Sequence, residues 1–227
     1  MTRTREDDCM STGPQAMSQS AFGTLRQFAR RQRTLERCEL CAADLPGHHD
    51  HLIELAERKL VCACLACAVL FSGHSGAKYK RVPQRVTLLA GFQMTDAHWD
   101  SLMIPIGMAF FFHNSLEGKV AAFYPSPAGA TESQLALETW SDIVSENPAL
   151  AEMQPDVEAL LVNRVSLMGG SSPAEYYLLP IDECYKLVGL IRTHWRGFSG
   201  GSEVWQELRN FFAGLRDRAI VRKEPNA

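Results

Sequence analysis

Two C-x2-C motifs, Cys38-Glu-Leu-Cys41 and Cys64-Leu-Ala-Cys67, are separated by twenty-two residues. A C-x2-C pair places two thiolates on one side of a tight turn, and two such pairs supply four sulfurs at tetrahedral corners. We therefore predict a metal site made by Cys38, Cys41, Cys64 and Cys67. Cysteines that are merely small buried apolar residues would not fall into two pairs at this spacing.

The residues between the two pairs predict a small β-structure. Pro46-Gly47 and the polar residues after it indicate a turn, and residues 52–55 and 59–62 alternate as two short strands do. This is the layout of a zinc ribbon or a rubredoxin-type pair of knuckles.

Other potential ligands lie nearby. On an extended strand Cys62 points the same way as Cys64. It could therefore replace Cys64 as a ligand, or contact the ligands without binding the metal itself. His48, His49 and His51 are also within reach, but a complete four-sulfur set leaves them no vacancy, which favours a solvated loop.

Zinc is the expected metal, because it is the usual occupant of a closed four-thiolate site. Mononuclear iron is the alternative and would make the protein a one-electron carrier. The residue after the second cysteine of each knuckle is commonly Gly, whereas here it is Ala42 and Ala68. This departure weakens the rubredoxin interpretation more than that of a generic ribbon.

The composition describes a globular protein. Of 227 residues 46% are hydrophobic and 22% charged, and the net charge of −3 provides no overall field for nucleic acid or anionic lipid. The charged N-terminus has no apolar segment behind it, and no apolar run reaches the roughly 20 residues of a membrane span. We expect a cytoplasmic protein, in which an odd number of cysteines favours metal binding over disulfides.

Three parts follow along the chain. Residues 1–20 read as a disordered tail, 21–81 as a basic helix plus the four-cysteine metal knuckle, and 82–222 as an α+β domain. The arginine-rich helix could grip phosphates, but a solvated helix face is the favoured interpretation, and we do not expect nucleic acid as a partner.

The α+β domain should contain a mostly antiparallel sheet with flanking helices. Residues 104–112 and 120–124 predict a hairpin, and 158–163 and 176–181 a second pair of strands. Three helices are expected to begin at caps formed by Thr131, Asp182 and Ser202.

The usual catalytic sequence patterns are absent, including a nucleophile elbow, a phosphate-binding loop, a dinucleotide fingerprint and HExxH. The loops at 125–133 and 199–202 could bind an anion at a helix N-terminus, although capped helix starts without a ligand are commoner. Cys184 lies on an apolar helix face and is expected to be a core residue rather than a reactive thiol.

Several longer segments carry a resemblance to a known family. They are Cys38–Cys41, Leu60–Cys67, Phe123–Ser133, Pro155–Arg164 and Leu179–Arg192. With these segments the chain, from about residue 36 to 215, resembles an uncharacterised bacterial family encoded beside high-affinity, actinobacterial-type nickel-iron hydrogenases. The resemblance implies an accessory role in assembling, supplying or docking on that hydrogenase, without an enzymatic activity to carry over.

Three hypotheses follow. The first is a non-enzymatic zinc protein that binds a hydrogenase subunit or maturation factor, or a second copy of itself. The second is a rubredoxin-like electron carrier, and the third a zinc-ribbon regulator that uses the basic helix on DNA. The apolar run over residues 103–112 looks richer than a lone sheet would bury, which predicts an interface there.

Overall fold

The computed structural model describes residues 36–74, 76–133, 137–165, 173–197 and 199–223. The predicted tail and nearly all of the predicted basic helix lie outside these residues. We call residues 37–81 the knuckle region and residues 82–223 the sheet region.

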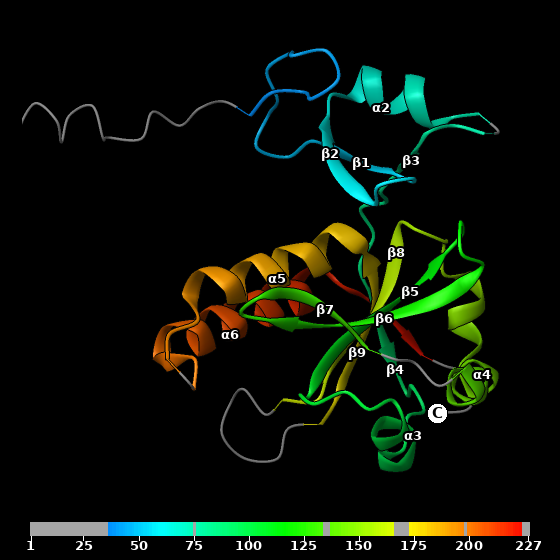
Figure 1. Cartoon of the computed structure of the whole chain (residues 1–227), viewed down its shortest axis with the longest axis vertical. Coiled ribbons are helices and arrows are strands. Elements are labelled where there is room, and N and C mark those ends of the chain that lie inside the picture. The colour runs from blue at the N-terminus through cyan, green and yellow to red at the C-terminus, as the bar shows by residue number, and fades with distance from the viewer. Residues whose placement is uncertain (1–35, 75, 134–136, 166–172, 198, 224–227) are drawn as a thin grey trace, which may run out of the picture. The chain divides into compact units, whose positions relative to one another are not determined.

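The knuckle region is built on a three-stranded antiparallel sheet of order β2-β1-β3 (Figure 1). Its elements are β1 (Asp50–Glu54), β2 (Lys59–Ala63), α2 (Leu65–Ser72) and β3 (Tyr79–Arg81). The two predicted strands are confirmed, and they pair with each other. Helix α2 was not expected, because its apolar sequence lacks the one-sided pattern of a surface helix.

The sheet region contains seven strands in the order β10-β4-β9-β8-β5-β6-β7. Neighbouring strands are antiparallel except β10 and β4, which are parallel. The strands are β4 (Thr87–Ala90), β5 (Met108–Asn114), β6 (Lys119–Ser126), β7 (Gly129–Ser133), β8 (Glu158–Asn163), β9 (Glu175–Pro180) and β10 (Ile220–Lys223). The α+β class, the mostly antiparallel sheet and both predicted strand pairs are confirmed.

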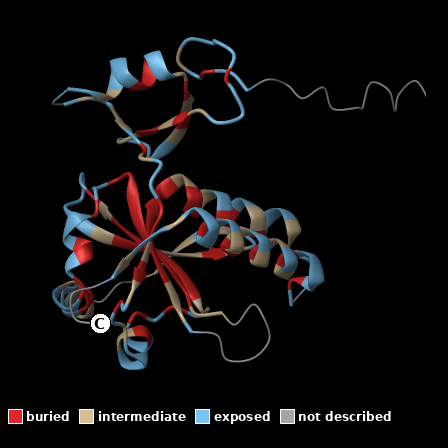
Figure 2. Ribbon diagram, turned by 180° about the vertical axis from the view of Figure 1, so that it is seen from behind, coloured by how far each residue is buried: buried red, intermediate tan, exposed pale blue. Residues whose placement is uncertain are grey.

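Helices cover both faces of this sheet. They are α3 (Asp96–Ser101), α4 (Leu137–Glu146), the short 3-10 helix η1 (Pro148–Glu152), α5 (Ile181–His194) and α6 (Gly201–Arg218). Phe110 and Phe112 pack towards α5 and α6, whereas Phe111 packs towards α3 and α4. This alternation is the two-residue period of a strand buried on both faces, and the central strands are accordingly buried along their length (Figure 2).

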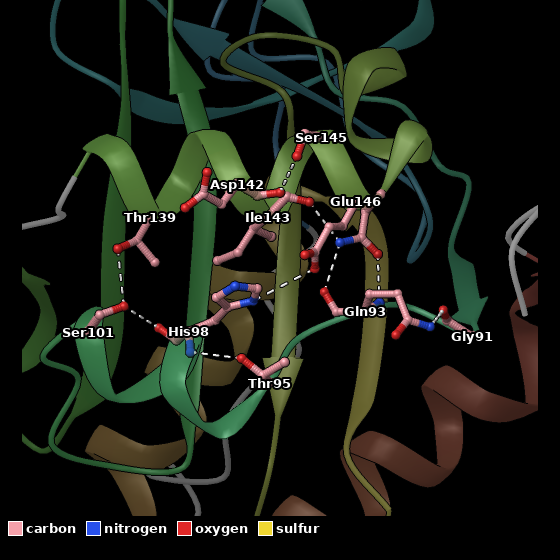
Figure 3. A network of polar contacts seen from close by, with 11 residues as sticks. Gly91, Gln93, Thr95, His98, Ser101, Thr139, Asp142, Ile143, Ser145 and Glu146 are labelled. Carbon is pink, nitrogen blue, oxygen red and sulfur yellow. Dashed lines mark hydrogen bonds and ion pairs between the residues drawn. The ribbon is translucent and has the colours of Figure 1, made fainter.

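A polar network joins α3, α4 and the segments next to them, on the face of the sheet towards which Phe111 packs (Figure 3). The fully buried Asn147 donates to the Ile143 and Gln93 carbonyls at 2.7 and 2.8 Å and accepts from the Gln93 N–H at 2.7 Å. The Ser101 hydroxyl donates to Thr139 at 3.1 Å and thereby joins α3 to α4. A buried amide with all its hydrogen bonds made favours one arrangement of the surrounding helices, because any other arrangement would leave buried polar groups unpaired.

The three predicted helix caps are wrong. Thr131 lies in β7, opposite Tyr124, because Ser126 and Gly129 form a tight β6–β7 hairpin. Asp182 lies inside the first turn of α5, whose N-cap is Pro180. Ser202 lies inside α6, whose N-cap is Gly200 in the left-handed conformation.

Most of the apolar run at residues 103–112, where an interface is predicted, is buried, although Met103 at its start is 77% exposed. Phe110, Phe111 and Phe112 are at most 3% exposed, since layers of helices cover both faces of β5. A group of exposed apolar side chains lies on α2, where Leu65, Val69 and Leu70 are 64%, 58% and 67% exposed.

Candidate metal centre

The first cysteine pair is held by a tight turn. The Cys38 N–H donates to the Ala43 carbonyl and the Ala42 N–H to the Cys38 carbonyl, both at 2.8 Å. Ala42 adopts a φ of 62°, the left-handed conformation that favours Gly. The turn therefore keeps the knuckle geometry with an alanine, at a cost of about 1 to 2 kcal/mol.

The second pair is built differently. Cys64 is the N-cap of α2 and Cys67 lies in the first helical turn. Ala68 is part of the helix and donates its N–H to the Cys64 carbonyl at 2.8 Å. A helix satisfies the backbone here, so this pair does not need a glycine.

The four sulfurs converge. The Sγ atoms of Cys38, Cys41, Cys64 and Cys67 lie 3.5–3.9 Å from one another, with Cys41 and Cys64 at 3.7 Å. All four are free thiols. A tetrahedral metal with bonds of about 2.3 Å requires sulfurs about 3.8 Å apart. The cluster can therefore bind a metal ion, and its geometry suits zinc and iron alike.

The titration of the thiols reflects this crowding. Burial opposes a charge on Cys38, but N–H groups of Cys64, Leu40 and Cys41 outweigh it and lower the Cys38 pKa to about 6. Burial and the neighbouring cysteines raise the pKa of Cys67 to about 12. One thiolate thus forms easily, whereas four thiolates in this space require a cation to compensate their charge.

Glu39 joins the first turn to β2. Its carboxylate accepts from the Cys62 N–H at 2.9 Å and from Lys59 Nζ at 3.0 Å, and the Glu39 N–H donates to the Cys62 carbonyl. The hydrogen bond from Cys62 and the charge of Lys59 lower the pKa of Glu39. These contacts hold the two cysteine pairs at a fixed separation.

Cys62 lies outside the four-cysteine set. It neighbours His49 and His51, and the ligand atoms of these three residues lie within 4.8 Å of one another. The expectation of a solvated loop fits His48, which is exposed, but is wrong for His49 and His51, which are half-buried. His51 lies in β1, and its Nδ1 is 2.7 Å from Asp182 Oδ2 in α5.

The sequence contained a signal for this arrangement. His49 and His51 are two residues apart, and such pairs lie on one side of an extended segment. The partner Asp182 could not be found this way, because 131 residues separate it from His51.

The two candidate anion loops differ. Residues 125–133 form a β-hairpin, so no helix N-terminus is present there. The loop at 199–202 does begin α6, as expected, but Glu203 lies in the first turn and contacts His194 Nδ1 at 2.7 Å. A carboxylate already compensates the positive helix end.

Cys184 is a core residue. It is fully buried in the cluster beneath α5, and burial raises its pKa well above 9.0. A thiol in this state is a poor nucleophile.

Comparisons with known proteins place the chain in a family. Within the described residues no helix combines the length and apolar character that crossing a bilayer requires. No curated protein and no solved structure matches the chain. A family model matches residues 37–219, which include the four-cysteine cluster and nearly all of the sheet region. The chain therefore belongs to DUF5947, a family of unknown function.

Proposed function

We propose that this protein is a non-enzymatic accessory protein in which the four-cysteine cluster binds a structural zinc ion. The observation that carries the proposal is the tetrahedral spacing of the four sulfurs, 3.5–3.9 Å. A site filled by four protein ligands leaves no coordination position for a substrate, which is the design of structural rather than catalytic zinc.

Helix α2 is the proposed docking element. It begins at the ligand Cys64 and exposes Leu65, Val69, Leu70 and Phe71. Exposed apolar side chains gathered on one short helix are typical of a protein–protein contact. A metal that fixes the start of α2 would therefore also shape the docking surface.

The proposed partner is a subunit or maturation factor of a nickel-iron hydrogenase. This step rests on the resemblance of the cysteine pairs and of the later segments to the family encoded beside such enzymes. Self-association through α2 is the alternative use of the same surface.

A rubredoxin-like electron carrier is the second candidate. One observation favours this candidate: Cys41 is exposed, so an electron-transfer partner can come close to this edge of the cluster. The same four sulfurs would then hold iron.

Metal analysis of protein purified from its native host separates the candidates. One zinc per chain and a colourless protein support the structural site, whereas red protein with one iron per chain supports the electron carrier. Protein that is folded but holds neither metal in the four-cysteine cluster would contradict both.

The docking surface is tested by Leu70→Glu together with Val69→Glu. We expect this variant to retain its metal but to lose capture of hydrogenase components, or its self-association in sedimentation. Leu116→Glu, at a site 62% exposed in the sheet region, is the matched control and should behave as wild type. Equal capture by both variants would exclude α2 as the contact.

A further inference from the structure

A second group of metal-ligating side chains lies on the knuckle sheet. His51 in β1 and Cys62 in β2 are direct cross-strand partners, and His49 precedes β1 by one residue. The ligand atoms of His49, His51 and Cys62 lie within 4.8 Å of one another, and the two imidazole centroids are 4.8 Å apart. Antiparallel pairing thus brings two nitrogens and one sulfur together, apart from the four-cysteine set.

Both imidazoles are oriented in the way that metal ligands are. His51 Nδ1 lies 2.7 Å from a carboxylate oxygen of Asp182, and His49 Nδ1 lies 3.1 Å from the Pro46 carbonyl oxygen. These oxygens only accept hydrogen bonds, so Nδ1 is the donor in each ring and Nε2 is the nitrogen that would coordinate a metal ion. A carboxylate or backbone carbonyl behind the ring is the usual support of a metal-binding histidine.

The group borders a hollow. His49 and His51 line a cavity of about 400 Å³, together with Asp182, Lys186 and Arg218. Two of the three ligands border this cavity, which provides space for water or a small ligand at a fourth coordination position, unlike the closed set of four cysteines.

We propose that His49, His51 and Cys62 form a second, open site for a divalent transition-metal ion, with Asp182 as a positioning residue. Two imidazoles and one thiolate suit zinc, copper or nickel and not the oxygen-seeking magnesium or calcium. Closing the ligands around an ion requires spacings of about 3.5 Å, which small side-chain rotations provide. The site joins β1 to α5, so a bound ion would link the knuckle region to the sheet region.

Anaerobic titration of the full chain with Co²⁺ tests the site, with the four-cysteine cluster filled beforehand with Zn²⁺. Wild type should bind one further equivalent, and its X-ray absorption spectrum should show two nitrogen ligands and one sulfur. His51→Ala and Cys62→Ser should lose this equivalent and retain the zinc. His74→Ala removes an exposed imidazole of the same region and should bind as wild type.

Asp182→Asn tests the positioning role. Loss of the carboxylate behind His51 should weaken the second equivalent by roughly 10 to 100-fold and leave the zinc content unchanged. Wild type that binds no further cobalt, a second ion without sulfur, or unchanged binding in His51→Ala and Cys62→Ser would each overturn the proposal. The wild-type stoichiometry and spectrum remain decisive even if a variant fails to fold. Because zinc in the four-cysteine cluster is measured separately, failure here does not count against the structural site.

Discussion

The knuckle region and the sheet region differ in what stabilises their cores. Among the described residues the knuckle cluster has seven buried members, and two of them, Cys38 and Cys67, belong to the four-cysteine cluster. The sheet region has two larger clusters, rich in Phe, Leu and Ile, one on each face of its sheet. A core as small as the first usually needs a metal or disulfides, whereas the second is sufficient by itself.

The largest expected effect is therefore that of metal removal. Chelation, or the variant Cys38→Ser, should unfold the knuckle region, because a structural zinc supplies an apparent 10 to 16 kcal/mol, in order of magnitude, to such sites. The sheet region should remain folded. Limited proteolysis with circular dichroism should then leave a resistant fragment that begins near residue 82.

Digestion of the whole chain after chelation would contradict this contrast. It would show that contacts such as that of Ile53, which is buried in the same cluster as Phe112 and Ile181, make the two regions one cooperative unit.

Truncation of the sheet core should have the next largest effect. Leu161 in the central strand β8 is fully buried, so Leu161→Ala should cost about 2 to 5 kcal/mol in the free energy of unfolding. Its metal content should not change. Denaturant unfolding measures the cost, and Leu116→Ala, at an exposed site, should change stability by less than about 0.5 kcal/mol.

An ion pair between the buried Asp156 and the half-buried Lys80 tests the contact between the regions. Burial opposes the charge of Asp156, but Lys80 Nζ at 2.5 Å and the Ser115 N–H at 2.8 Å outweigh it and hold the Asp156 pKa below its ordinary 3.8. The folded-state pKa is the lower one, so this stabilisation is present above pH 3.8 and is lost as the pH falls below it.

Asp156→Asn should accordingly cost about 1 to 3 kcal/mol at neutral pH and flatten the acid limb of the stability profile. The Asp44–Arg37 pair is the control, because both side chains are more than 60% exposed and Asp44→Asn should have little effect. An unaltered acid limb in Asp156→Asn would show that this pair does not couple the regions.

The smallest expected effect concerns the start of α6. Gly200 has a φ of 86°, and an added Cβ would lie 2.8 Å from Val204 Cγ1. Gly200→Ala should therefore lower the thermal midpoint through a cost of roughly 1 to 2 kcal/mol. Gly214→Ala, in the same helix with no atom within 4 Å, should raise it slightly. Equal changes of the thermal midpoint in both variants would show that the left-handed conformation of Gly200 does not explain the effect.

The sequence predicted what depends on spacing along the chain. The two C-x2-C pairs, the strands of the hairpin and the β8–β9 pair all show their periodicity or ligand pattern locally. The helix starts were mispredicted, because Thr131, Asp182 and Ser202 are good caps whose positions are decided by strand pairing and by a left-handed glycine.

The features that sequence reasoning missed depend on residues far apart. Asp182 became visible as the partner of His51 only once α5 was in place. Phe111 stacks on Trp140 of α4, which packs on the same face of the sheet, and no local pattern joins these two positions.

The strand order has a consequence for the sequence of events during synthesis. Strand β4 lies between β10 and β9, so both strands with which its residues 87–90 pair, at 175–180 and 220–223, leave the ribosome much later. All four cysteines of the cluster, by contrast, lie within thirty residues of one another. Because local contacts form sooner than distant ones, we expect the nascent chain to acquire its metal while the larger sheet is still incomplete.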